Sequence, residues 1–147
     1  MCLDAGSSLP LSARQLNPVV LVDTSTWIRF LSDREPYAVV LQRLLSLEQV
    51  CGHELVYGEL LIGDCGGRTK FLESYERMHQ VSTVPHSEVV EFVRHRALHG
   101  RGVGWIDIHL LASALVNRVQ LWTADPRFAA LALELGVAYE PLASAGA

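Results

Sequence analysis

Short apolar segments alternate with stretches of helical periodicity along most of this chain. The first segment, Val-Val-Leu-Val at 19–22, is a β-branched run typical of a strand buried in a parallel sheet. Further strands are expected at 50–51, 81–84, 120–123 and 137–139. Helices are expected at about 27–31, 37–49, 53–62, 69–79, 87–99, 107–118 and 126–135. This alternation predicts an α/β fold, with a short central parallel β-sheet and helices on both faces.

The length of 147 residues suits one compact domain. Residues 1–18 are small and polar with two prolines, and are interpreted as a flexible N-terminal extension. The domain is expected at 19–142, followed by a short C-terminal tail at 143–147. The sequence contains neither a signal peptide pattern nor an apolar run long enough to span a bilayer, so no membrane association is expected. The three cysteines, Cys2, Cys51 and Cys65, form neither an even set nor a CxxC pair, which favours the reducing cytoplasm.

Composition gives weaker indications about partners. Twelve basic against 16 acidic residues give a net charge of −4, which argues mildly against general polyanion binding. A nuclease remains compatible with this charge, because acids that hold cations reverse their local sign once metal is bound. The mean hydropathy of +0.22 is high for a small monomer and suggests that a second copy or another protein covers apolar surface.

Two acids follow predicted strands. Asp23 comes directly after 19–22, and Asp125 lies just beyond Trp122. Ligands of open α/β sheets bind outside the carboxyl ends of the strands, so both acids are placed to face that crevice. The structural alternative is that each is a helix N-cap, since Asp23 precedes Thr-Ser-Thr and Asp125 precedes Pro126.

Two further acids lie on apolar helix faces. The positions three and four residues from Glu59 are Leu55, Val56, Ile62 and Gly63. On the helix face that carries Asp107, the residues three, four, seven and eight positions later are Leu110, Leu111, Ala114 and Leu115. Both acids are therefore predicted to point toward the core side, where an unpaired charge costs several kcal/mol.

A hard divalent cation would offset that cost. Lys70 is the only lysine, and few arginines fall near the four acids. Mg²⁺ or Mn²⁺ prefers carboxylate and water oxygens, and four converging acids would suit one or two such ions. The alternative is that Glu59 and Asp107 are buried acids paired with arginine.

The segments that carry these acids resemble the PIN-domain family, most closely the VapC toxins. The matching blocks are VDTSTWI at 22–28, ELLIG at 59–63, WIDIHLLASAL at 105–115 and LWTADPRF at 121–128. They occur in the family's order and span about 19–140. The resemblance implies a PIN fold in which Asp23, Glu59, Asp107 and Asp125 bind Mg²⁺ or Mn²⁺. It further implies that Thr123 holds water at the metal or orients Asp125, with Thr24 and Ser25 as nearby hydroxyls.

The resemblance also implies a function. It predicts a metal-dependent endoribonuclease toxin that hydrolyses RNA phosphodiester bonds and inhibits translation and growth unless a VapB-type antitoxin binds it. A homodimer is implied as well. One alternative is a catalytically inactive, PIN-like RNA-binding protein. Another is a haloacid-dehalogenase-type phosphatase, which would need a second aspartate where Ser25 stands.

Basic and aromatic residues are the remaining candidates for contact with RNA. Arg94, Arg96 and Arg101 belong to the only concentrated basic stretch and are candidate RNA phosphate contacts, with a solvated helix face as the alternative. Trp27, Trp105 and Trp122 have side chains able to stack on bases, but each lies in an apolar segment, which favours packing.

Overall fold

The computed structural model describes residues 19–141, so the predictions for 1–18 and for the tail at 143–147 lie outside the described residues. Three parallel strands form the sheet: β1 (Val20–Val22), β2 (Val50–Cys51) and β3 (Gln120–Trp122). The strand order is β2-β1-β3, with β1 in the centre. Every residue of β1 is 0% exposed, because both faces of the sheet are covered. The predicted parallel α/β architecture is confirmed.

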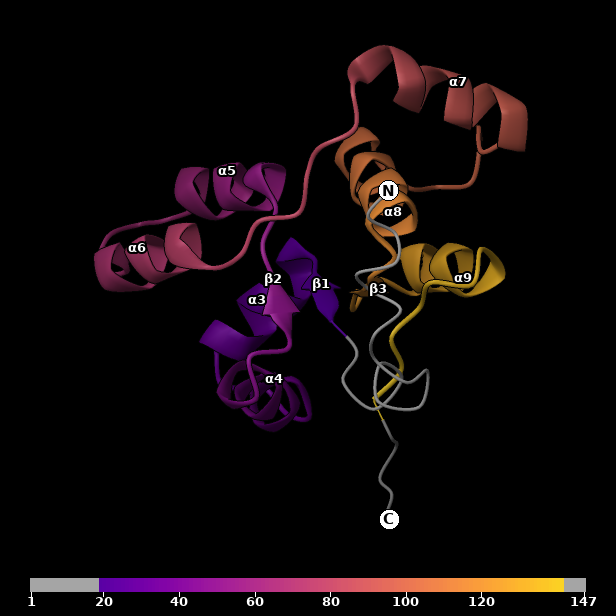
Figure 1. Cartoon of the computed structure of the whole chain (residues 1–147). Coiled ribbons are helices and arrows are strands. Elements are labelled where there is room, and N and C mark those ends of the chain that lie inside the picture. The colour runs from indigo at the N-terminus through magenta and orange to yellow at the C-terminus, as the bar shows by residue number, and fades with distance from the viewer. Residues whose placement is uncertain (1–18, 142–147) are drawn as a thin grey trace, which may run out of the picture.

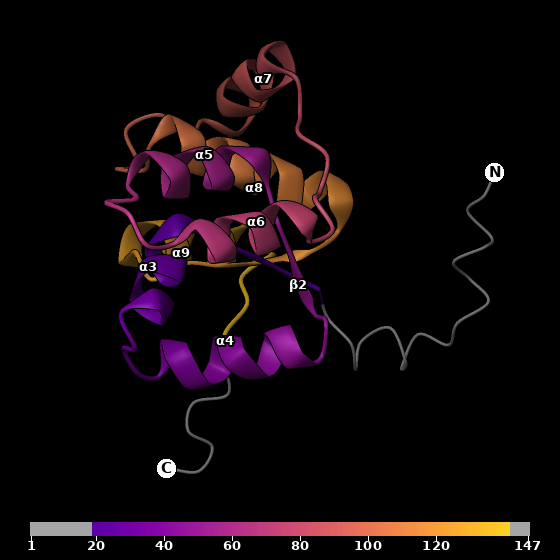
Figure 2. The same cartoon turned by 90° about the vertical axis from the view of Figure 1, so that its left-hand side faces the viewer.

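Seven helices surround this sheet within residues 19–141. They are α3 (Thr24–Leu31), α4 (Tyr37–Ser46), α5 (Glu54–Ile62), α6 (Thr69–Arg77), α7 (His86–Arg96), α8 (Trp105–Asn117) and α9 (Pro126–Glu134). In both views α4 lies on one side of the sheet and α8 on the other (Figures 1 and 2). Helix α7 lies farthest from the strands and packs on α8.

The helix expected at 87–99 is shorter than its sequence pattern suggests. It ends at Arg96 because Ala97 adopts a left-handed conformation with φ of 52°, which stops the helix. His99 lies beyond the end of this helix, so its spacing of four residues from His95 does not place the two side chains on one helix face.

Two expected strands are absent from the described structure. The segment at 81–84 forms no bridge, although Gln80 just before it makes a single parallel bridge to Gly52, and 137–139 is reduced to one bridge between Ala138 and Leu121. Their apolar residues are buried, with Val81 at 5% and Val137 at 9% exposure. The hydrophobic pattern in both segments therefore reflects burial in the core and not strand pairing. For 81–84 the neighbouring strand β2 is itself only two residues long.

The core lies between the sheet and the helices that cover it. Its largest fully buried side chains include Trp27, Tyr75 and Phe128. Trp27 packs edge-on against Tyr75, with ring centroids 5.6 Å apart. Between residues 19 and 141, no helix combines the length and apolar character needed to cross a bilayer.

Tyr75 also joins α6 to the start of α5 through polar contacts. Its hydroxyl accepts a hydrogen bond from the backbone N–H of His53 at 2.9 Å and lies 3.4 Å from the carbonyl of the same residue. Both partners are buried, so this hydroxyl satisfies a backbone donor that water cannot reach.

We expect Tyr75→Phe to lower the free energy of unfolding by about 1–3 kcal/mol, because it leaves the buried His53 N–H without its acceptor. Urea denaturation monitored by circular dichroism measures this change. Tyr37→Phe, which removes a hydroxyl from a partly buried ring stacked on Trp122, is the matched control. Equal stability of both variants would contradict the proposed role of the Tyr75 hydroxyl.

Candidate functional site: four carboxylates at one end of the sheet

The end of β1 fixes the position of Asp23. The backbone N–H of Asp23 donates to the Trp122 carbonyl at 3.0 Å, which continues the pairing of β1 with β3 by one residue. Asp23 is then the N-cap of α3, and its Oδ1 accepts from the Thr26 N–H at 3.1 Å. The N-cap alternative from the sequence is therefore confirmed. Since the side chain is only 4% exposed, the same residue also presents a nearly buried carboxylate at the carboxyl end of the sheet.

Two hydroxyls hold the Asp23 carboxylate. Ser25 Oγ donates to Oδ1 at 2.7 Å, and Thr123 Oγ1 donates to Oδ2 at 2.6 Å. Each hydroxyl also accepts from the segment after β3, Ser25 from the N–H of Ala124 at 3.1 Å and Thr123 from that of Asp125 at 3.0 Å. These bonds lock the ends of β1 and β3 together and give Thr123 a defined role as the support of Asp23.

Glu59 reaches the same region from α5. The hydroxyl of Thr24, the residue after Asp23, donates to Glu59 Oε1. The buried face of α5 is formed by Val56 and Leu60, while Ile62 is 89% exposed. The prediction that Ile62 shares a core-facing stripe with Glu59 is therefore wrong. Glu59 is half-buried at the edge of the buried face and faces the start of α3.

Asp107 and Asp125 are held by helix starts. Asp107 Oδ2 accepts from the Gly104 N–H at 3.1 Å, in the first turn of α8. Asp125 is the N-cap of α9, with Oδ1 accepting from the Arg127 N–H at 2.9 Å. Asp107 is half-buried, and the residues that follow on its face, Leu110 and Leu111, are buried as predicted.

Asp107 lies within electrostatic reach of the three other acids. Burial raises the pKa of Asp107, and the charges of Asp23, Glu59 and Asp125 raise it further, against the Gly104 hydrogen bond. Burial likewise raises the pKa of Asp23, against the bonds from Thr123 and Ser25. The ion pairs found between residues 19 and 141, Arg94–Glu91 and Arg101–Glu134, include none of these acids. The structural alternative of acids neutralised by arginine is not observed.

The donor set suits a hard divalent cation. A carboxylate has about four acceptor positions, and the hydrogen bonds described above leave some open on every one of the four acids. Among the residues that the structure describes, no group of three or more His, Cys, Asp or Glu side chains already has the spacing of metal ligands. Each carboxylate is held by its own hydroxyl or backbone N–H, which keeps the repelling charges apart. Side-chain movements would be needed to gather them around an ion.

A buried histidine connects the two helices that carry Glu59 and Asp107. His53 is 0% exposed and is the N-cap of α5, with Nδ1 accepting from the Leu55 N–H at 3.1 Å. Its Nε2 lies 3.0 Å from Ser113 Oγ on α8, and the bond at Nδ1 makes Nε2 the donor. Sequence reasoning missed this link, because a single His before a helix gives no sign of its distant partner.

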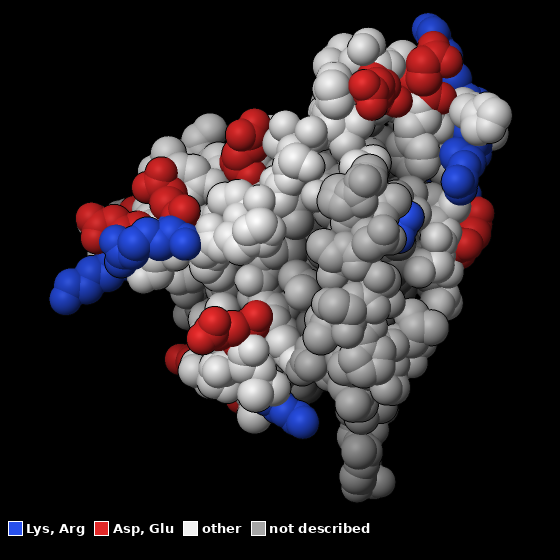
Figure 3. Space-filling view, in the orientation of Figure 1, with Lys and Arg blue, Asp and Glu red and all other residues white. Residues whose placement is uncertain are grey.

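The basic stretch lies on the outside of the molecule. Arg94, Arg96 and Arg101 are exposed. Arg94 pairs with Glu91, and Arg101 makes a two-pronged contact with Glu134 at 2.7 and 3.3 Å. Blue and red side chains accordingly lie side by side over α7 (Figure 3). This surface therefore has mixed charge.

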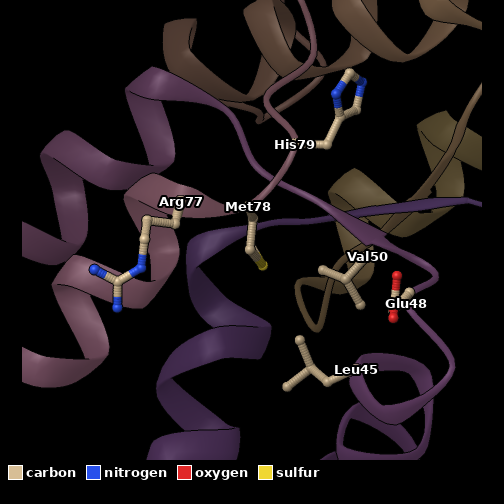
Figure 4. Close-up of a pocket in the computed structure, with 6 residues that line it drawn as sticks. All are labelled: Leu45, Glu48, Val50, Arg77, Met78 and His79. Atoms are coloured by element: carbon tan, nitrogen blue, oxygen red, sulfur yellow. The ribbon is translucent and has the colours of Figure 1, made fainter.

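A cavity of about 320 Å³ opens at the other end of β2 (Figure 4). It is lined by Leu45, Glu48, Val50, Arg77, Met78 and His79. Val50 begins β2, whereas the acids follow the carboxyl ends of the strands or lie on helices beside them. This cavity is therefore separate from the acidic site.

The fold and the order of the acids are those of a known family. A model of the PIN domain family matches residues 20–134, a range that contains Asp23, Glu59, Asp107, Asp125 and Thr123. The chain therefore belongs to the PIN-domain family. Within that family it is of the VapC type, as its similarity to the following relatives shows.

The relatives are the proteins named Ribonuclease VapC32 in two strains of Mycobacterium tuberculosis, CDC 1551 / Oshkosh and ATCC 25618 / H37Rv. Each is 40% identical to this chain over 121 residues, which is 82% of this chain and 95% of the relative. The crystal structure of PAE2754 from Pyrobaculum aerophilum is similar with a TM-score of 0.50 and 15% identity, covering 82% of this chain and 90% of that one. At this identity the similarity concerns the fold alone.

We expect Asp107→Asn to raise the Tm in EDTA by about 3 °C, because it removes a partly buried charge that three other acids repel. The amide oxygen still accepts from the Gly104 N–H. Asp64→Asn is the matched control, since Asp64 also accepts from a backbone N–H, that of Gly66. A lower Tm for Asp107→Asn than for the control would contradict the repulsion.

The His53 link makes stability depend on pH. Burial, together with the nearby charge of His109, lowers the pKa of His53 from 6.5 to about 4. The unfolded chain therefore binds the proton first, and stability falls as pH drops from 6.5 toward 4, by up to about 1.4 kcal/mol per pH unit. The raised pKa values of Asp23 and Asp107 act in the opposite direction as pH falls.

Chemical denaturation across this pH range, comparing the parent with His53→Asn, separates these contributions because the acids are common to both proteins. We expect the variant to be less stable at pH 7.5 and to lose less stability on acidification. An identical pH dependence would show that His53 is not buried in its neutral form.

Proposed function

We propose that this chain is a divalent-metal-dependent endoribonuclease toxin, in which Asp23, Glu59, Asp107 and Asp125 together bind Mg²⁺ or Mn²⁺. The observation that carries the proposal is that the charges of Asp23, Glu59 and Asp125 all act on the half-buried Asp107. Between residues 19 and 141, none of the four acids has an ion pair that would offset this repulsion. Family membership and the name of the 40%-identical relatives, Ribonuclease VapC32, support an RNA substrate.

The ion supplies two things when bound: it lowers the pKa of water and stabilises negative charge on a phosphate. The residues of this chain do the positioning. Thr123 and Ser25 fix both oxygens of Asp23, so that the central carboxylate cannot rotate. Thr123 also accepts from the Asp125 N–H, which sets the distance between the loop carrying the last acid and Asp23. The acids hold the metal, and none is required as a covalent nucleophile.

The remaining features concern partners. We propose hydrolysis of RNA phosphodiester bonds that inhibits translation and growth, relieved by a VapB-type antitoxin, in a homodimer that acts in the cytoplasm. Exposed apolar side chains such as Ile62 on α5 and Val39 on α4 support coverage by a protein partner. Arg94, Arg96 and Arg101 remain proposed RNA contacts, and two of them would have to exchange an acidic partner for phosphate.

We expect the purified protein to cleave RNA in Mg²⁺ or Mn²⁺ and to be inactive in EDTA. Asp23→Asn and Asp107→Asn should abolish cleavage because each removes a metal-binding charge. Thr123→Val should lose about 10–100-fold, and Thr123→Ser should recover most of that loss, since a hydroxyl suffices to hold Asp23. Gel analysis of labelled RNA measures all of these, with Asp64→Asn as the control.

Cleavage that survives EDTA, or equal cleavage by the parent and both aspartate variants, would overturn the proposal. Expression of the parent, but not of Asp23→Asn, should arrest growth if the ribonuclease is a toxin. Growth arrest by both would separate toxicity from the acidic site.

A further inference from the structure

One tryptophan differs from the others in its surroundings. Trp27 and Trp122 are 1% and 4% exposed, which confirms the prediction that they pack in the core. The same prediction is wrong for Trp105, which is 43% exposed although it is among the largest apolar side chains in the protein. It is the first residue of α8 and stands two positions before Asp107.

Two histidine rings contact Trp105 from different elements. His109, one turn along α8, has its ring centroid 4.9 Å from the indole with an interplanar angle of 87°. His86, the first residue of α7, lies at 5.3 Å with an angle of 62°. We call these three residues the aromatic rim. These two ring contacts, from α7 and α8, restrict the indole, so that a ligand meets an ordered surface and little side-chain entropy remains to be lost on binding.

We propose that the aromatic rim is a stacking surface for a nucleobase of the RNA substrate, with Trp105 as the residue that contacts the base. The inference rests on the ribonuclease function proposed above. The indole offers the largest aromatic surface of any side chain, and unpaired bases in single-stranded RNA are recognised by stacking on aromatic rings.

The position of the rim fits such a role. Positions two apart in an α-helix have Cα atoms about 5.4 Å apart and side chains that leave on different sides of the axis. Trp105 and Asp107 therefore flank the first turn of α8. On the proposed function, the RNA strand would cross the first turn of α8, with a phosphate at the acids on one side of the helix axis and a neighbouring base on the indole at the other.

The charge of the protein makes an uncharged contact valuable. The net charge is −4, so the protein surface away from the proposed metal offers little attraction to a polyanion. Two of the three candidate arginines are already paired with Glu91 and Glu134. Attraction to the RNA backbone is therefore weak for a nucleic-acid-binding protein, and stacking supplies affinity that does not depend on charge.

The test uses the tryptophan as its own probe. In an Asp23→Asn background with Mg²⁺ present, a short single-stranded RNA is titrated while tryptophan emission is recorded. We expect the RNA to quench emission, and Trp105→Ala to remove the quenching and raise Kd about 10-fold or more. Trp105→Phe should keep most of the affinity while losing the signal, and melting curves confirm that each variant is folded. Leu133→Ala, at a residue of α9 that is 57% exposed, is the control.

A double-mutant cycle identifies the contact. A set of RNAs is prepared, each with one abasic nucleotide at a different position. At one position the missing base should weaken binding to the parent as much as Trp105→Ala weakens binding of the intact RNA. The variant should then bind that abasic RNA no more weakly than it binds the intact RNA. Additive losses at every position, or unchanged binding by Trp105→Ala, would overturn the proposal. Unchanged RNA binding with weakened binding of an antitoxin would assign the rim to a protein partner instead and likewise overturn it.

The two proposals fail separately. If RNA quenches Trp105 emission and the double-mutant cycle shows coupling, but the parent does not cleave RNA, the stacking surface is retained and the nuclease is rejected. Cleavage with an unchanged KM in Trp105→Ala would retain the nuclease and reject the stacking surface.

Discussion

The burial of acidic side chains close to Asp107 is the constraint that the hydrogen bonds of this site must offset. Asp23 and Asp107 both have raised pKa values because burial disfavours their charge, and Asp107 also feels the three other acids. A folded chain tolerates this only if other groups hold the acids in place. Here the hydroxyls of Thr24, Ser25 and Thr123 do so, together with backbone N–H groups at helix starts.

The sheet provides the rigidity that these hydrogen bonds need. The centre strand is fully buried, and the backbone bond from Asp23 to Trp122 carries the pairing past the end of the strand. Two acids thereby sit on neighbouring strand ends, and two more are brought in by α5 and α8. The His53–Ser113 bond joins these helices in the buried interior. Three of the four candidate acids thus lie at strand ends or in the first turn of a helix and Glu59 lies within α5, while the His53–Ser113 contact that supports them lies in the core.

The charges near Asp107 destabilise its ionised form, and a bound cation would offset that effect. In the proposed function, the acids whose charges act on Asp107 would become ligands of a cation, so the feature that disfavours the charged site would also favour metal binding. Capping and metal binding are compatible in Asp23 and Asp125, because a carboxylate that caps a helix keeps acceptor positions free. The aromatic rim adds an uncharged surface beside an otherwise repulsive one.

The amino-acid sequence by itself determined the alternation of strands and helices, the acids after β1 and β3, and the buried face that follows Asp107. These are local patterns, set by periodicity and by residues adjacent in the chain. Only the tertiary structure decided that 81–84 and 137–139 form no strands, that Ile62 is exposed, and that Arg101 pairs with Glu134. It also decided which hydroxyl holds Asp23 and which residue His53 reaches. Those outcomes depend on contacts between residues far apart in the chain, and a local pattern carries no information about such partners.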